Sequence, residues 1–135
     1  MNRDMILIVD DSKFVAQAYS RVVVGLGYRV LIACDGKTGI FAAESCKPSL
    51  ILLDMLMPDM DGLKVLRTLK RTPSTNHIPV VVTSSLSEKN GSELIQEGTH
   101  GYFEKGSMTQ EKLENAISGI LKKRLLVPGG QESQV

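Results

Sequence analysis

Short apolar runs alternate with segments of helical periodicity along almost the whole chain, and this alternation constrains the fold more than any other feature. The first run, Met5-Ile6-Leu7-Ile8-Val9, is continuously apolar, as is typical of strands buried on both faces. Residues 13–26 follow, with apolar positions every three or four residues, which indicates an amphipathic helix. Later runs repeat this order. The pattern therefore predicts parallel strands joined by helical crossovers.

The same alternation predicts five strands and five helices. We expect strands over residues 5–9, 28–33, 50–53, 78–82 and 102–103, and helices over residues 13–26, 38–46, 63–71, 88–97 and 109–125. Right-handed crossovers then place helices on both faces of one parallel sheet, which is the doubly wound α/β arrangement. In such a sheet, binding sites form beyond the carboxyl ends of the strands.

One domain accounts for nearly all of the 135 residues. A chain of this length buries about two-thirds of the surface that its unfolded form exposes, which is enough for a single core without disulfides or a structural metal. We expect the domain to span residues 1–125. Residues 126–135 contain Pro128-Gly129-Gly130, and we expect them to form a flexible tail or the start of a linker.

Charge and hydropathy argue against several classes of function. The 16 basic and 15 acidic side chains leave a net charge of +1, without the basic excess of nucleic-acid-binding domains, so we expect no direct binding of nucleic acid. No apolar run approaches the ~20 residues of a membrane helix, and we expect a cytoplasmic protein without membrane contact. Cys34 and Cys46 belong to no metal-binding motif, and we expect both thiols to be buried.

Polar residues gather where the expected strands end. Asp10 and Asp11 follow the first strand, Asp54 the third, Thr83 the fourth and Lys105 the fifth. Each residue alone has an ordinary explanation as a helix cap or a solvated side chain. Together they lie at one edge of the predicted sheet, and this coincidence indicates a functional site.

The chemistry of these side chains favours phosphoryl transfer. Three carboxylates at adjacent strand ends repel one another unless a cation lies among them, and oxygen ligands without histidine or thiolate favour Mg²⁺. Asp54 would keep a carboxylate oxygen able to act as a nucleophile and form an acyl phosphate. Mg²⁺, the Lys105 ammonium and the Thr83 hydroxyl would together neutralise the oxygens of the transferred group.

These motifs resemble those of the receiver domain of bacterial two-component response regulators, including stand-alone regulators of the chemotaxis type. The resemblance covers residues 4–124. It rests on Asp10-Asp11, on Leu-Leu-Asp-Met-Leu-Met-Pro-Asp-Met-Asp-Gly over residues 52–62, on Thr83-Ser84 and on Gly-Tyr-Phe-Glu-Lys over residues 101–105. It implies a flavodoxin-like sheet of five parallel strands in the order 2-1-3-4-5.

The resemblance also implies a role for each site residue. Asp54 would be the phosphoacceptor, and Thr83 and Lys105 would bind the phosphoryl oxygens. Mg²⁺, or Mn²⁺ in its place, would be held by Asp11, Asp54 and the backbone carbonyl of Leu56, with Asp10 assisting through water. The donor would be a phosphohistidine on a sensor histidine kinase or phosphotransfer protein, or a small molecule such as acetyl phosphate.

In the family, phosphorylation changes a protein-binding surface. An aromatic residue at the position of Tyr102 turns inward, and the face made by the fourth helix, fifth strand and fifth helix changes shape. This face would bind a downstream target protein or a second copy of the chain. By resemblance, the protein would be a signalling switch that assists its own Mg²⁺-dependent phosphorylation and dephosphorylation, and would not otherwise be an enzyme.

Two positions bear on the kinetics of such a switch. Gly106 stands where a proline usually follows the lysine in the family, and glycine permits many backbone geometries. Leu56 occupies a family position that tunes dephosphorylation, and an apolar side chain cannot orient an attacking water, which predicts slow self-hydrolysis. The alternative function is a receiver-fold interaction module that binds partners without phosphorylation.

Overall fold

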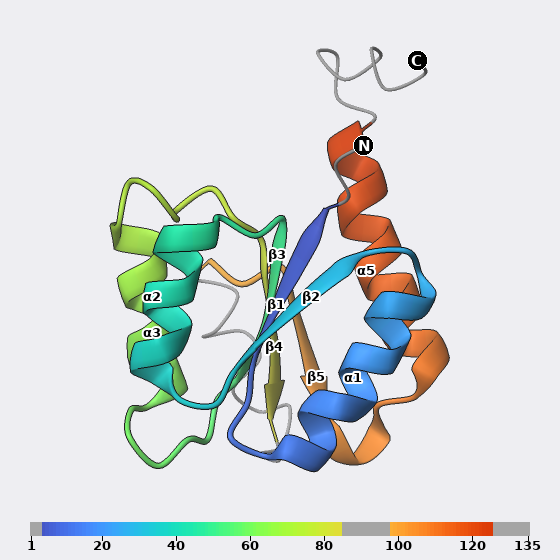
Figure 1. Ribbon diagram of the computed structural model, residues 1–135, viewed down its shortest axis with the longest axis horizontal. Helices are drawn as coiled ribbons and strands as arrows, with labels where there is room; N and C mark the ends of the chain where they lie inside the picture. The colour runs from blue at the N-terminus through green and yellow to red at the C-terminus, as the bar shows by residue number, and fades with distance from the viewer. Residues whose placement is uncertain (1–3, 85–97, 126–135) are drawn as a thin grey trace.

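The computed structural model describes residues 4–84 and 98–125, in which a five-stranded parallel sheet lies between two pairs of helices (Figure 1). The strands are β1 (Met5–Val9), β2 (Arg29–Ala33), β3 (Leu50–Asp54), β4 (Val80–Ser84) and β5 (Gly101–Glu104). The helices are α1 (Lys13–Gly25), α2 (Gly36–Cys46), α3 (Gly62–Arg71) and α5 (Gln110–Leu125), and the 3₁₀ turn η2 spans Lys105–Ser107. The strand order β2-β1-β3-β4-β5 confirms the predicted fold. The helix expected over 88–97 and the tail expected over 126–135 lie outside the described residues.

The expected and observed elements differ most at β4, which begins and ends two residues later than the predicted range 78–82. Pro79 has no N–H to donate to the sheet, and its carbonyl accepts the first bond, from the Ile51 N–H at 2.9 Å. Helix α2 begins at Gly36, ahead of the predicted residue 38, because the Asp35 side chain caps it. The shift of β4 places Thr83 inside the strand.

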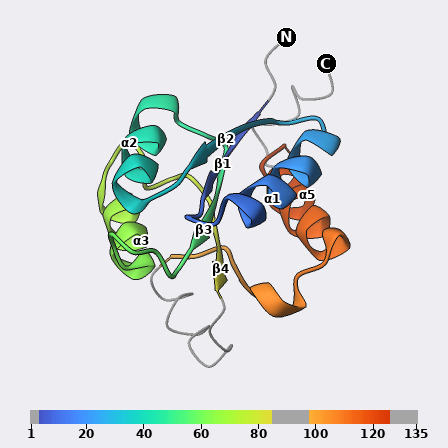
Figure 2. The same ribbon diagram turned by 60° about the horizontal axis from the view of Figure 1, so that its bottom comes forward.

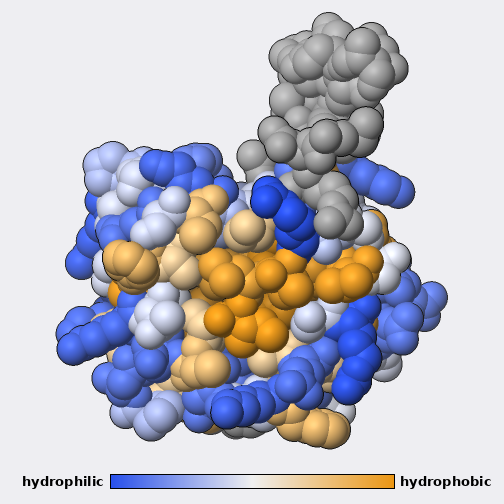
Figure 3. Space-filling view, in the orientation of Figure 1, coloured by the Kyte–Doolittle hydropathy of each residue, from blue (hydrophilic) through white to orange (hydrophobic). Residues whose placement is uncertain are grey.

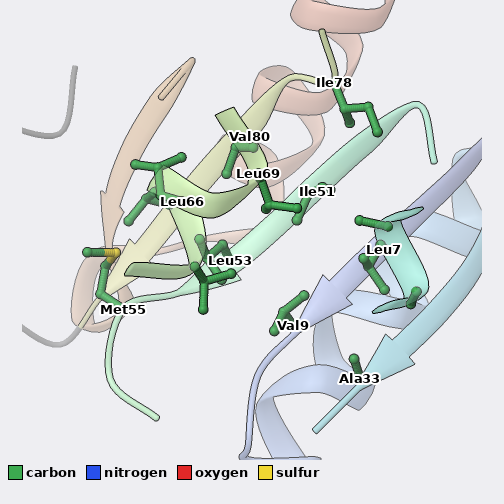
Figure 4. Close-up of a cluster of buried hydrophobic side chains, with 14 residues drawn as sticks. Leu7, Val9, Ala33, Ile51, Leu53, Met55, Leu66, Leu69, Ile78 and Val80 are labelled. Carbon is green, nitrogen blue, oxygen red and sulfur yellow. The ribbon is translucent and has the colours of Figure 1, made fainter. Parts of the chain in front are cut away.

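Each face of the sheet carries its own apolar core. In the α2–α3 core, side chains of the sheet such as Leu53 pack against Leu66 and Leu69 of α3 (Figure 4). In the α1–α5 core, Leu52 packs with residues of α1 and α5, among them Tyr19. Neighbouring residues of β3 enter different cores because successive side chains of a strand point to opposite faces.

Some apolar surface lies outside these cores. Figure 3 shows apolar side chains gathered over the β2 edge of the sheet, where Ile32 is 37% exposed. Phe14 of α1 and Phe41 of α2 are exposed as well. Among the described residues, no helix is long and apolar enough to span a membrane.

The expectation of buried thiols is wrong. Cys34 and Cys46 are both free and exposed. Cys34 follows the last residue of β2 and Cys46 is the last residue of α2, so both lie at the ends of elements rather than along their packed faces.

Gly62, the first residue of α3, lies against the backbone that carries Asp54. A Cβ at position 62 would lie 2.4 Å from the Met55 Cα and 2.9 Å from the Asp54 carbonyl oxygen. We therefore expect Gly62→Ala to displace the start of α3 and to lower the free energy of unfolding by about 1–3 kcal/mol, as measured in urea. Gly25→Ala is the control, because a Cβ there meets nothing within 4 Å. Equal stability of the two variants would contradict this reading of Gly62.

Candidate functional site

The five polar residues singled out in the sequence come together at the carboxyl edge of the sheet, which lies at the bottom of Figure 1 and comes forward in Figure 2. Carboxylate oxygens of Asp10, Asp11 and Asp54 all lie within 4.8 Å of one another. The Lys105 ammonium is 3.0 Å from Asp10 Oδ2 and 3.3 Å from Asp54 Oδ2. Thr83 lies opposite Asp54 in the register of β3 and β4. The parallel topology alone brings these residues together from four strand ends.

Asp54 is the last residue of β3 and is 2% exposed. Its Oδ1 accepts a hydrogen bond from the Leu56 N–H at 3.2 Å. Burial raises the pKa of Asp54 and the Asp10 charge adds to this effect, although the Leu56 N–H and the Lys105 ammonium oppose it. A raised pKa makes the carboxylate more basic than an ordinary aspartate, which suits a nucleophile in a partly enclosed site.

Asp10 offers a buried oxygen that lacks a hydrogen bond. Its Oδ1 accepts from the Ser12 N–H at 2.9 Å. Its Oδ2 is buried, and no described residue donates a hydrogen bond to it, so the 3.0 Å contact with Lys105 is an ion pair only. An orphaned buried carboxylate oxygen beside two further aspartates suits a hard cation or a water bound to one. The donor set therefore fits Mg²⁺.

Lys105 begins the η2 turn directly after β5, and its side chain is 21% exposed. Burial alone would lower the pKa of Lys105, but the close negative charges of Asp10 and Asp54 raise it overall. The ammonium therefore remains protonated at neutral pH. Gly106 is exposed and a Cβ there would meet nothing within 4 Å, so packing does not require glycine at this position.

Thr83 has a neighbour that the sequence did not reveal. Its side chain is 1% exposed and lies near the hydroxyl of Tyr19 on α1, close enough to affect the pKa of that tyrosine. Burial raises the pKa of Tyr19, while the nearby Lys105 ammonium and the Thr83 side chain oppose the rise. In the sequence Tyr19 is one of the apolar stripe of α1. The only signal was that a buried tyrosine hydroxyl usually needs a hydrogen-bond partner.

Tyr102, the expected switch aromatic, lies on the other face of the sheet. It is half-buried, pairs with Val82 in the register of β4 and β5, and packs against the α2–α3 core. Tyr19 belongs to the α1–α5 core. Two tyrosines therefore approach the end of β4 from opposite faces.

Asp59 anchors the loop that follows Asp54. Its exposed carboxylate accepts hydrogen bonds from the N–H groups of Gly36 at 2.9 Å and Lys37 at 3.2 Å, at the start of α2. These bonds, that from Gly36 most strongly, hold the pKa of Asp59 below its usual value. The sequence placed Asp59 in a motif but gave no role for it, because residues 36 and 59 become neighbours only in the folded chain.

The lowered pKa of Asp59 makes a prediction for acid pH. The pKa of Asp59 is lower in the folded than in the unfolded protein. The anchor therefore stabilises the loop fully at pH values above the unfolded-state pKa, and this stabilisation is lost as the pH falls through the folded-state pKa. We expect the Gly36 and Lys37 amide signals to shift in that range in an NMR titration. The same shift in Asp59→Asn would show that another group titrates there.

Fold and site together define a doubly wound α/β domain with an acidic cluster at the strand ends. The response regulator receiver domain family matches residues 6–118. The chain is 35% identical over 116 residues to a gliding motility regulatory protein of Myxococcus xanthus, covering 85% of this chain and 15% of that protein. It is 29% identical over 117 residues to protein PilH of Pseudomonas aeruginosa, covering 86% and 96%. The receiver domain of the Francisella response regulator 1452 superposes with a TM-score of 0.82 at 26% identity, covering 90% and 98%.

The chain belongs to the response regulator receiver domain family. Receiver domains of two-component systems are signalling switches that generally use Mg²⁺ and interact with histidine kinases or phosphotransfer proteins and with downstream targets. The chain spans 15% of the length of the Myxococcus relative and 18% of that of the response regulator PleD of Caulobacter vibrioides.

Proposed function

We propose that this chain is a phosphoacceptor switch that takes a phosphoryl group from a phosphohistidine onto Asp54. The main support for this proposal is the environment of Asp54. Its carboxylate is almost fully buried at the carboxyl edge of the sheet, and the Lys105 ammonium is 3.3 Å away. A sensor histidine kinase or a phosphotransfer protein would be the donor. The product would switch a protein-binding surface toward a downstream target.

The transfer follows from the side chains present. An Asp54 carboxylate oxygen attacks phosphorus, a P–O bond forms, the P–N bond to the donor imidazole breaks, and that imidazole leaves with its electron pair and takes up a proton. The Lys105 ammonium and the Thr83 hydroxyl are placed to meet the developing negative charge on the phosphoryl oxygens. Because both belong to the folded sheet edge, little reorganisation is required.

A divalent cation fits beside these groups. Asp10, Asp11, Asp54 and the Leu56 backbone carbonyl would hold Mg²⁺ or Mn²⁺. When bound, the cation supplies positive charge that offsets the mutual repulsion of the carboxylates and the charge of the phosphoryl oxygens. The orphaned Oδ2 of Asp10 supports this assignment.

An amide NMR comparison tests the proposed function. Beryllofluoride, a mimic of the acyl phosphate, is added with Mg²⁺ to the wild type and to Asp54→Asn. We expect shifts at Thr83 and Tyr102 in the wild type and none in the variant. Absence of shifts in both proteins would favour an interaction module that works without phosphorylation.

The apolar side chain of Leu56 leads us to expect a long-lived phosphoaspartate. Its side chain is 48% exposed beside the acceptor but has no polar group with which to orient an attacking water. We expect the phosphoprotein to outlast a timescale of seconds after removal of the donor, and Leu56→Asn to shorten its lifetime, as followed by intact mass. Decay of the wild type within seconds would refute the prediction.

A further inference from the structure

The loop between β3 and α3 carries Leu56, whose backbone carbonyl is one ligand of the proposed cation site. The first residue of this loop is held from two sides. The Met55 N–H donates to the Thr83 carbonyl at 3.0 Å, and the Met55 carbonyl accepts from the Gly62 N–H at 3.1 Å. These bonds hold the base of the loop between β4 and α3, and the position of the rest of the loop depends on its contacts with α2.

Two contacts join the middle of this loop to the first turn of α2. The two carboxylate oxygens of Asp59 accept one hydrogen bond each, from the Gly36 N–H at 2.9 Å and the Lys37 N–H at 3.2 Å. The Met60 side chain lies against Gly36, because a Cβ at position 36 would be 2.9 Å from the Met60 Cβ. N–H groups in the first turn of a helix have no acceptor within the helix, and the helix dipole there favours a negative charge. The start of α2 is therefore a strong attachment point for the Asp59 carboxylate.

We propose that Asp59 is a positioning residue for the cation site, which clamps the loop bearing Leu56 to the start of α2 and thereby raises the affinity for Mg²⁺. The inference rests on the proposed function, through the Leu56 carbonyl as a ligand. Asp59 lies three residues beyond Leu56 in the chain. A loop that is held in place before the cation arrives loses less conformational freedom on binding. Asp59 thus contributes order to the site, and α2 becomes part of the machinery that holds the metal.

Asp35 provides a matched control at the same helix end. Its carboxylate accepts a hydrogen bond from the Thr38 N–H at 2.7 Å and caps α2. That bond joins two residues at the start of α2 and does not include the loop. Removal of either Asp35 or Asp59 therefore takes away one negative charge and one capping carboxylate from α2, but only the removal of Asp59 releases the loop.

Dissociation constants for Mg²⁺ test the clamp. They are measured by amide NMR titration for the wild type, Asp59→Ala, Asp59→Asn and Asp35→Ala. We expect binding to weaken about three- to tenfold in Asp59→Ala and less in Asp59→Asn, whose amide keeps one acceptor oxygen. Asp35→Ala should bind Mg²⁺ nearly as tightly as the wild type. Equal losses in Asp59→Ala and Asp35→Ala, or wild-type affinity of Asp59→Ala, would overturn the inference alone.

Hydrogen exchange of the wild type gives a second readout, which a merely structural role of Asp59 would not change. Coupling between two events is reciprocal, so a clamp that favours Mg²⁺ is itself favoured by Mg²⁺ to the same degree. Saturating Mg²⁺ should slow exchange of the Gly36 and Lys37 N–H groups about three- to tenfold and leave the Thr38 N–H unchanged. Equal slowing at all three amides, or no slowing at Gly36, would overturn the inference. Failure of the wild type to bind Mg²⁺ would overturn the cation site of the proposed function and the inference with it.

Discussion

We expect Asp54→Asn to abolish covalent phosphorylation of the chain by acetyl phosphate and Mg²⁺. The amide has no carboxylate oxygen to attack phosphorus, and no other described carboxylate of the cluster sits opposite Thr83 in the sheet. Intact mass spectrometry should show one added phosphoryl group on a fraction of the wild type and none on the variant. A phosphorylated Asp54→Asn protein would mean that another residue is the acceptor.

The same variant should remain folded, which separates loss of chemistry from loss of structure. Asp54 has a raised pKa, so its ionised form is disfavoured in the folded state and lowers stability at neutral pH. Replacing it with a neutral isostere removes this cost. We expect the thermal midpoint of Asp54→Asn to equal or exceed that of the wild type. A clearly lower midpoint would make the loss of phosphorylation uninformative about Asp54 as acceptor.

Lys105→Met should lower the rate of phosphorylation by about 10²–10³, the usual effect of removing one charged or hydrogen-bonding group that stabilises a transition state. The ammonium lies within 3.3 Å of both Asp10 and Asp54, so its removal also leaves two buried carboxylates without their cation. Lys64→Met, at an exposed position of α3, is the control. Comparable rates in the two variants would exclude Lys105 from the chemistry.

The stability of Lys105→Met should depend on pH. Loss of the ammonium raises the pKa of Asp54 further above its unfolded value. A carboxyl with a raised folded pKa destabilises the fold as pH rises through that pKa, so the deficit is largest at neutral pH, about 1–3 kcal/mol, and shrinks on acidification. Urea unfolding at several pH values measures it. Added Mg²⁺ should reduce the deficit, and a deficit independent of both would point to lost packing instead.

The fold could be predicted from the sequence because its signals are local. The continuous apolar run of β1 and the helical periodicity of α1 depend only on near neighbours along the chain. The convergence of Asp10, Asp54 and Lys105 followed as well, since parallel strands with one hand of crossover leave no other edge for them. The first and last residues of β4 were harder to predict from the sequence, because they depend on the hydrogen bond between Pro79 and the neighbouring strand.

The exposed thiols, the Asp59 anchor and the approach of Tyr19 to Thr83 were decided by tertiary structure. Each depends on which surfaces meet across the chain: Asp59 reaches Gly36 of α2, and Tyr19 on α1 reaches Thr83 on β4. The helical periodicity assigns Tyr19 to the buried face of α1, but it does not predict which polar side chain lies near the Tyr19 hydroxyl. The sequence by itself thus determined the order of elements and the residues at one edge of the sheet, because backbone geometry and hydrophobic burial dictate both. Only the packed structure determined which hydroxyl and which N–H groups those residues contact, because hydrogen bonds depend on ångström distances between distant segments.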